Sequence, residues 1–365
     1  MAVMMPCRFH IATLVALTLL IASAAQAQLS ASYLYRLSDF NGPVESLWAR
    51  LAIDPEQGEV YTLDRSDKFI GIYNQTAMQT FGFGEDLRLA SASDIAAGDN
   101  GEIFILYRHP ASSIKHLDYR GAAIADIRIE QAGFQPDYID YQAGKLYLAD
   151  SGSMRVLVAS TNGDIEEDYD FRKQINVQIK ESIKNSELNE AQRKSIREDL
   201  EKLSGAIFGG FGVDRTGNIY FTLGSLFTAY RYFPQNDQLQ AFGTPGSAPG
   251  KFGVVASICA DSQGNIYVSD RLRCVVLMFD AELNYQNEFG YRGSQAHNLV
   301  VPDDIAIDEK NHRLYVAQAA NRGVSVFSLA APAAAKNKQL AEKHLALNPE
   351  RRSENETSQT ATVDM

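Results

Sequence analysis

Two aspartates occupy the same local context, and matching carboxylates are candidates for holding a cation. Asp94 and Asp304 each open a short apolar strand with the sequence Asp-Ile-Ala. Calcium prefers oxygen ligands of this kind, so the two residues are candidate calcium ligands if their strands meet around a common axis. The alternative is that each carboxylate caps backbone N–H groups at the start of its strand.

A second group of candidates lies where other apolar strands end. Arginine offers several N–H donors in a flat fork, and beside aromatic residues it suits recognition of a protein partner. The candidates for partner binding are Arg65, Tyr107, Arg108, His109 and Arg271. Aspartates stand at equivalent strand ends, at Asp64, Asp150 and Asp270. These we expect mainly to bond the backbone of their own turns.

The histidines and cysteines do not predict a zinc centre or an activated nucleophile. A catalytic zinc site needs several converging ligands, and the histidines after residue 27 are scattered along the chain. The sequence contains no Cys-x-x-Cys, His-Glu-x-x-His or Gly-x-Ser-x-Gly motif. Cys259 and Cys274 fall on the first and third strands of one predicted sheet, so a disulfide would need a detour around the second strand.

A repeated strand–turn–strand signature must position all of these residues. An aromatic residue in an apolar strand follows a turn in each of six places, at Tyr61, Phe104, Tyr147, Tyr220, Tyr267 and Tyr315. The intervals are 43, 43, 73, 47 and 48 residues. Gly or Asn in the turns supplies the positive φ of a tight hairpin. A period in the mid-forties with four short strands per unit predicts an all-β six-bladed β-propeller, since a β-sandwich would not repeat one signature at this interval.

The ends of the repeat predict how the ring closes. The sixth unit, residues 304–329, offers only three strands, and an orphan strand at residues 32–37 precedes the first complete unit. We expect this N-terminal strand to complete the last blade, which removes two exposed sheet edges.

The interval of 73 residues contains an insertion of helical character at residues 171–203. Ile175, Ile179 and Ile183 are spaced four apart, and Ile196, Leu200 and Leu203 form a second apolar stripe. Asn189 and Gln192 have the spacing of a capping box. The segment holds eight Lys or Arg against six Asp or Glu. It predicts a slightly basic helical hairpin, acting either as a lid over the channel or as a partner-binding arm.

The units resemble NHL repeats, a family that builds six-bladed propellers. Residues 261–270, Asp-Ser-Gln-Gly-Asn-Ile-Tyr-Val-Ser-Asp, follow the family pattern closely, and blade three keeps its Asp150 and Arg155. Other blades depart from it, with Tyr107, Leu223 and Gln318 where the Asp would fall. The resemblance implies a binding platform for protein, RNA or another ligand, and less often an enzyme.

The flanking segments and the charge predict where the protein acts. Residues 1–27 have a basic start, an apolar run from Ile11 to Ala22 and an Ala-Gln-Ala cleavage pattern, typical of a signal peptide for export to a periplasm or beyond. After cleavage we expect no membrane span. Residues 331–365 predict a short helix and a disordered tail. A net charge of −11 argues against nucleic acid as a partner.

These observations favour an exported, non-enzymatic propeller that binds a protein or peptide partner and has no obligatory cofactor. The binding face would be the rim carrying the loops between second and third strands together with the helical insertion. The alternative is a metal-dependent lyase or lactonase acting at the channel mouth, with Asp94 and Asp304 holding the ion.

Overall fold

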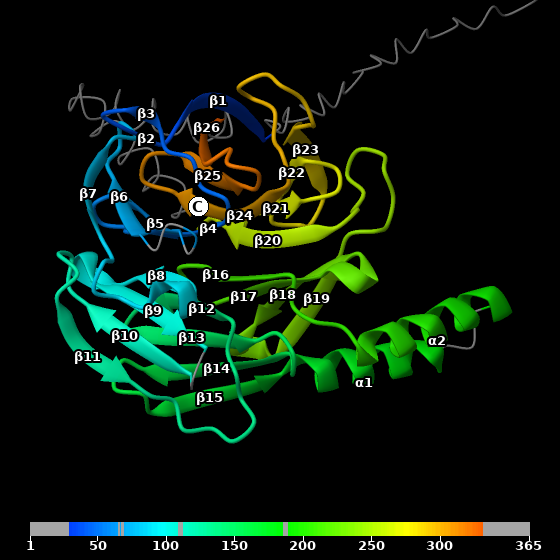
Figure 1. Cartoon of the computed structure of the whole chain (residues 1–365). Helices are drawn as coiled ribbons and strands as arrows, with labels where there is room; N and C mark the ends of the chain where they lie inside the picture. Colours follow the sequence, from blue (N-terminus) through cyan, green and yellow to red (C-terminus); the bar gives the residue numbers. More distant parts are fainter. Residues whose placement is uncertain (1–28, 65, 67–68, 109–111, 185–188, 331–365) are drawn as a thin grey trace, which may run out of the picture. The chain divides into compact units, whose positions relative to one another are not determined.

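The computed structural model describes residues 29–64, 66, 69–108, 112–184 and 189–330, and these form six four-stranded antiparallel sheets. The innermost strands of neighbouring sheets contact one another around a central channel (Figure 1). This arrangement confirms the predicted all-β six-bladed propeller.

The strands of each blade are called a to d from the channel outwards. Blades one to three are β4 (Ala49–Ile53), β5 (Val60–Asp64), β6 (Phe69–Tyr73), β7 (Gln79–Phe83); β8 (Ala92–Ala97), β9 (Ile103–Tyr107), β10 (Ser113–Leu117), β11 (Ala123–Ile127); and β12 (Tyr138–Gln142), β13 (Lys145–Asp150), β14 (Arg155–Ser160), β15 (Ile165–Asp170). Blades four to six are β16 (Gly210–Val213), β17 (Ile219–Leu223), β18 (Thr228–Phe233), β19 (Gln238–Phe242); β20 (Val255–Ala260), β21 (Ile266–Asp270), β22 (Val275–Phe279), β23 (Tyr285–Gly290); and β24 (Pro302–Asp308), β25 (Arg313–Gln318), β26 (Val324–Ala330), β1 (Ser30–Arg36).

Blade six is built from both ends of the described chain, as predicted. Strand β1 pairs antiparallel with β26, from Ser30 opposite Ala330 to Arg36 opposite Ser325. The Leu37 N–H then donates to the Val324 carbonyl at 3.0 Å. A short ribbon of β2 (Ser38–Asp39) and β3 (Gly42–Pro43) follows before blade one begins.

The repeated signature has a physical cause in the turn between strands a and b. In blade four the Asp214 carboxylate accepts hydrogen bonds from the Thr216 N–H and from the Tyr220 hydroxyl, both at 2.8 Å. Gly217 in the same turn has φ of 83°, where a side chain would be strained. Tyr220 itself is buried, so the aromatic residue fills the core and anchors the turn at once.

The insertion forms two helices, α1 (Phe171–Ile183) and α2 (Glu190–Ser204), which lie side by side and extend away from blades three and four (Figure 1). The Asp170 side chain caps α1, and Asn189 with Gln192 forms the predicted capping box of α2. Of the described helices, none is long and apolar enough to cross a membrane.

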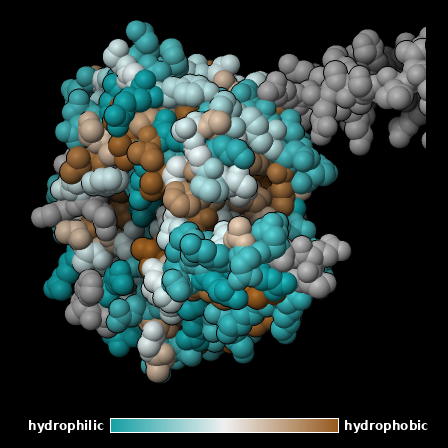
Figure 2. Space-filling model, turned by 90° about the vertical axis from the view of Figure 1, so that its right-hand side faces the viewer, coloured by the Kyte–Doolittle hydropathy of each residue, from teal (hydrophilic) through white to brown (hydrophobic). Residues whose placement is uncertain are grey.

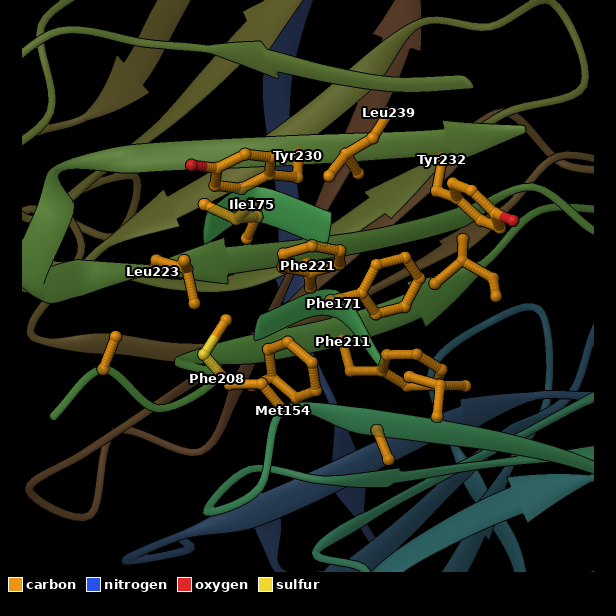
Figure 3. Close-up of a cluster of buried hydrophobic side chains, with 14 of the residues drawn as sticks. Met154, Phe171, Ile175, Phe208, Phe211, Phe221, Leu223, Tyr230, Tyr232 and Leu239 are labelled. Carbon is orange, nitrogen blue, oxygen red and sulfur yellow. The ribbon is translucent and has the colours of Figure 1, made fainter. Parts of the chain in front are cut away.

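Helix α1 is rooted in the core between blades three and four. Figure 3 shows Phe171 and Ile175 among the side chains of Phe221, Tyr230 and Tyr232, and the Phe171 and Phe221 ring centroids are 4.7 Å apart. Leu203 at the end of α2 joins the same cluster. The base of the hairpin is therefore part of the propeller's hydrophobic core.

Three further expectations from the sequence concern the two ends of the chain and the cysteines. The predicted signal peptide at residues 1–27 and the tail at 331–365 lie outside the described residues. Within the described part, Cys259 and Cys274 are both free.

Candidate functional site

The a strands surround a channel with a cavity of about 440 Å³. Ala49 pairs with Asp64 and Tyr138 with Ala149, so each a strand begins beside the loop that joins strands b and c. The b–c loops and the connections between blades lie on one rim, here named the b–c rim, and the a–b turns lie on the other. Small apolar side chains make much of the wall, including Ala52, Ala96, Val213, Ala260 and Ala306.

At the b–c end of the cavity an arginine sits among carboxylates. Arg50 on β4 has its Nη1 atom 3.9 Å from Oδ1 of Asp304, and its guanidinium lies over the Tyr138 ring at 5.4 Å from the centroid. Burial lowers the pKa of Arg50, but Asp304 and Asp94 outweigh it, so the pKa is raised and the residue stays cationic. Its side chain is 22% exposed, because it borders the cavity.

The channel aspartates bond the backbone of the next blade. Asp94 accepts from the Ile139 N–H at 2.9 Å, Asp140 from the Val213 N–H at 2.8 Å, and Asp304 from the Leu51 N–H at 2.9 Å. Asp304 also accepts from the Ser257 hydroxyl at 2.8 Å. Burial raises the pKa of Asp94 and of Asp140 to about 7 and raises that of Asp304 as well. These carboxylates join neighbouring blades around the ring.

Asp94 and Asp304, the predicted calcium ligands, do lie at one end of the channel. Blade one stands between their blades, and its Arg50 already supplies positive charge to both carboxylates. Within the described residues, no group of three or more His, Cys, Asp or Glu is placed to hold a metal ion. The arrangement favours the capping role that the sequence left open, and the calcium site stays a prediction.

On the b–c rim, the aspartates at strand ends hold their own loops, as expected. Asp150 accepts from the N–H groups of Gly152 and Ser153, at 2.9 and 3.1 Å. Asp270 accepts from the Arg273 N–H of its own loop at 2.9 Å, and also from the Gly253 N–H, in the connection that leads into its blade, at 2.5 Å. The Ser66 N–H donates to Asp64 at 2.8 Å.

The predicted partner-binding arginines also bridge blades. Arg108 pairs with Asp137 at 2.5 Å, and Arg271 pairs with Asp303. In both cases the carboxylate lies at or just before the start of the next blade's a strand. Arg108 keeps 41% of its side chain exposed and Arg271 keeps 36%. Both side chains are therefore partly open to solvent.

The other predicted rim residues behave differently. Tyr107 is buried, and its hydroxyl has no hydrogen-bond partner among the described residues. Arg65 and His109 lie outside the described residues.

A fully enclosed ion pair stands next to these loops. Arg273 bonds Glu288 through both ends of its fork, one of them at 2.9 Å, and the side chains are 10% and 1% exposed. Glu288 also accepts from the Gly250 N–H at 3.0 Å. This pair ties the b–c loop of blade five to its d strand.

Exposed apolar side chains gather on the b–c rim. Figure 2 views the molecule from the side on which the hairpin projects and shows brown apolar atoms at several places around its centre. Large exposed hydrophobic residues in the rim's loops are Leu47, Trp48, Ile207, Val254 and Leu272, the last 68% exposed. Exposed apolar groups that share one face are typical of interaction surfaces.

The helical hairpin projects from this rim and does not border the cavity. Arg172 of α1 donates to the carbonyls of Gly152 and Ala206, at 2.9 and 2.8 Å, which fixes the base of α1 to the b–c loop of blade three. Among the described residues of α1 and α2, none lines the channel cavity. The described part of the hairpin therefore does not border the channel, and its role as a partner-binding arm stays a prediction.

Sequence reasoning missed Arg50, Tyr138 and Asp140. Arg50 lies between Ala49 and Leu51, and Asp140 between Ile139 and Tyr141, so a charged residue inside an apolar strand is the signal that could have found these two. Asp94 and Asp304 could be identified as candidates because both stand in the sequence Asp-Ile-Ala, whereas Arg50 has no counterpart in the other blades.

Comparisons with known proteins show the fold and no more. No family model and no curated protein matches the chain, so the likeness to NHL repeats stays a prediction. Among solved structures, a Bacteroides thetaiotaomicron protein of unknown function is 12% identical with a TM-score of 0.54, covering 83% of this chain and 76% of its own. A gluconolactonase from Xanthomonas campestris is 12% identical with a TM-score of 0.52, covering 85% and 93%. A streptogramin B lyase is 12% identical with a TM-score of 0.50, covering 84% and 99%.

Proposed function

We propose that this chain is an exported, non-enzymatic propeller that binds a protein or peptide partner through the b–c rim and the helical hairpin. The observation that carries the proposal is the hairpin itself, rooted in the core at Phe171 and Leu203 yet extending beyond the blades. A rigid base holds the outer turns in place, so a partner would pay little entropy to order them.

The chemistry of the rim supports the same proposal. Exposed Trp48 and Leu272 offer apolar anchors of the kind that dominate interface energetics, and the half-exposed Arg108 and Arg271 offer donors on the same rim. The hairpin is slightly basic on a chain of net charge −11, so an acidic partner surface would be attracted to it.

The test shortens the hairpin without disturbing its base. Deleting residues 171–203 would remove buried Phe171, Ile175 and Leu203 and so damage the core. A better variant replaces residues 181–194 with a short Gly-Ser linker, because its described side chains lie outside the core clusters. Crosslinking and pull-down from the native envelope fraction should recover partner proteins with the wild type, and the shortened variant should lose them.

Two further variants test whether capture of the partner depends on the b–c rim or on the channel. Leu272→Ser should weaken capture through the rim, and Arg50→Met, which changes only the channel, should leave it intact. Circular dichroism melts confirm that each variant folds. If the shortened hairpin and Leu272→Ser both capture the same proteins as the wild type, the proposed binding face is wrong.

A further inference from the structure

The guanidinium of Arg50 has hydrogen-bond donors to spare. Its nearest carboxylate, on Asp304, lies at 3.9 Å, beyond hydrogen-bond distance, and the guanidinium makes no hydrogen bond to any described residue. Arginine carries five N–H donors in a fork that fits a carboxylate. A cation that borders a cavity of about 440 Å³ with its donors open is equipped to bind a ligand.

The hydrogen bonds that the neighbouring carboxylates accept come from groups other than Arg50. Asp304 accepts from Leu51, Ser257 and Ile305, and Asp94 accepts from Ile139. The cation–π contact with the Tyr138 ring helps to hold the guanidinium in place. The arginine is thus oriented by its surroundings while its hydrogen-bonding edge stays available.

The remainder of the cavity is acidic. Asp140 lies two residues along β12 from Tyr138, about 7 Å further into the channel. Beyond it the lining includes Glu56, Asp99, Asp214 and Glu309, while Arg215 is paired with Glu309 at 3.1 Å. A ligand with only negative charge would be repelled along this path.

We propose that the channel binds a small zwitterion, with its carboxylate on Arg50 and its ammonium group directed toward Asp140 and the acidic a–b end. The apolar alanines of the wall would contact the carbon chain between the two charged groups. This site shares none of its residues with the proposed partner-binding face, so either proposal can fail alone.

The test uses three probes of one length: 6-aminohexanoate, hexanoate and hexylamine. Isothermal titration calorimetry on the full mature chain should show 6-aminohexanoate binding at least about tenfold more tightly than either single-charge probe. In Arg50→Met its affinity should fall about 10- to 100-fold, whereas the affinity for hexylamine should hold or rise. Arg50→Lys, which keeps the charge but not the fork, should fall in between.

Fold controls and three possible results decide whether the proposal stands. Thermal melts establish that Arg50→Met and Arg50→Lys are folded, and Arg50→Lys carries the test if Arg50→Met is not. Equal affinity of the wild type and the folded Arg50 variants for 6-aminohexanoate would overturn the proposal. So would hexanoate binding as tightly as the zwitterion, or no binding of 6-aminohexanoate to the wild type at about 10 mM.

Discussion

The b–c rim and the channel use the same residue types in opposite ways. On the rim, the carboxylates of Asp137, Asp303 and Glu288 are held by arginines. In the channel, Asp94 and Asp304 are held by backbone N–H groups of the next blade, and Arg50 is left with open donors. Arg108 is more exposed than Arg50, yet its ion pair is the closer one, at 2.5 Å to Asp137 against 3.9 Å from Arg50 to Asp304. What an arginine can bind therefore depends on how closely its own donors are paired, more than on its exposure.

The largest expected effect tests the enclosed pair of the rim. Arg273→Met leaves Glu288 buried without its cation, so the free energy of unfolding should fall by about 3–5 kcal/mol. Urea denaturation measures this change. Arg155→Met is the matched control, since its partner Asp168 is 43% exposed, and it should cost under about 1 kcal/mol. Similar losses of unfolding free energy in both variants would show that burial of the Arg273–Glu288 pair does not increase its contribution to stability.

An intermediate effect concerns protonation in the channel. Because the pKa of Asp140 is about 7 in the folded protein and about 4 when unfolded, its contribution to stability is lost as pH rises from 4 to 7. Asp140→Asn cannot ionise, so its melting temperature should fall less between pH 5 and pH 8 than that of the wild type. The difference should be about 2–3 kcal/mol, or roughly 5 °C.

The control for this experiment is Asp164→Asn, a change at an exposed turn position. It should follow the wild type at both pH values. Asp214 and Asp304 also act on Asp140, so the comparison is made between variants rather than from one curve. A pH dependence in Asp140→Asn equal to that of the wild type would contradict the assignment.

The smallest expected effect concerns the exposed ion pair between Arg108 and Asp137 on the b–c rim. A double-mutant cycle of Arg108→Ala and Asp137→Ala should give a coupling energy of about 0.2–1 kcal/mol, because the arginine is 41% exposed. A weak pair lets Arg108 exchange Asp137 for a partner's carboxylate at low cost. A coupling of several kcal/mol would instead make Arg108 purely structural.

The sequence predicted the elements well because they rest on local signals. The turn before each aromatic, the period of the repeat and the capping box at Asn189 are all set by residues close together in the chain. Closure by the N-terminal strand followed from counting strands in the last unit.

The site was harder to predict because it depends on contacts between blades. Arg108 meets Asp137 and Asp94 meets Ile139 across blade boundaries, and nothing near either residue in the sequence specifies its partner. The role of Arg50 could not be predicted because it depends on the hydrogen-bond donors that remain open once the six a strands surround the channel.

Strand β1 has a consequence for the timing of folding. Its partner β26 lies almost three hundred residues later in the chain, so the sixth sheet cannot be completed until the other five have been synthesised. Five blades can collapse earlier, but their ring stays open at both ends. The native ring is therefore acquired in a late step that joins the two ends of the repeat, and truncation at either end should affect every blade interface by leaving that step undone.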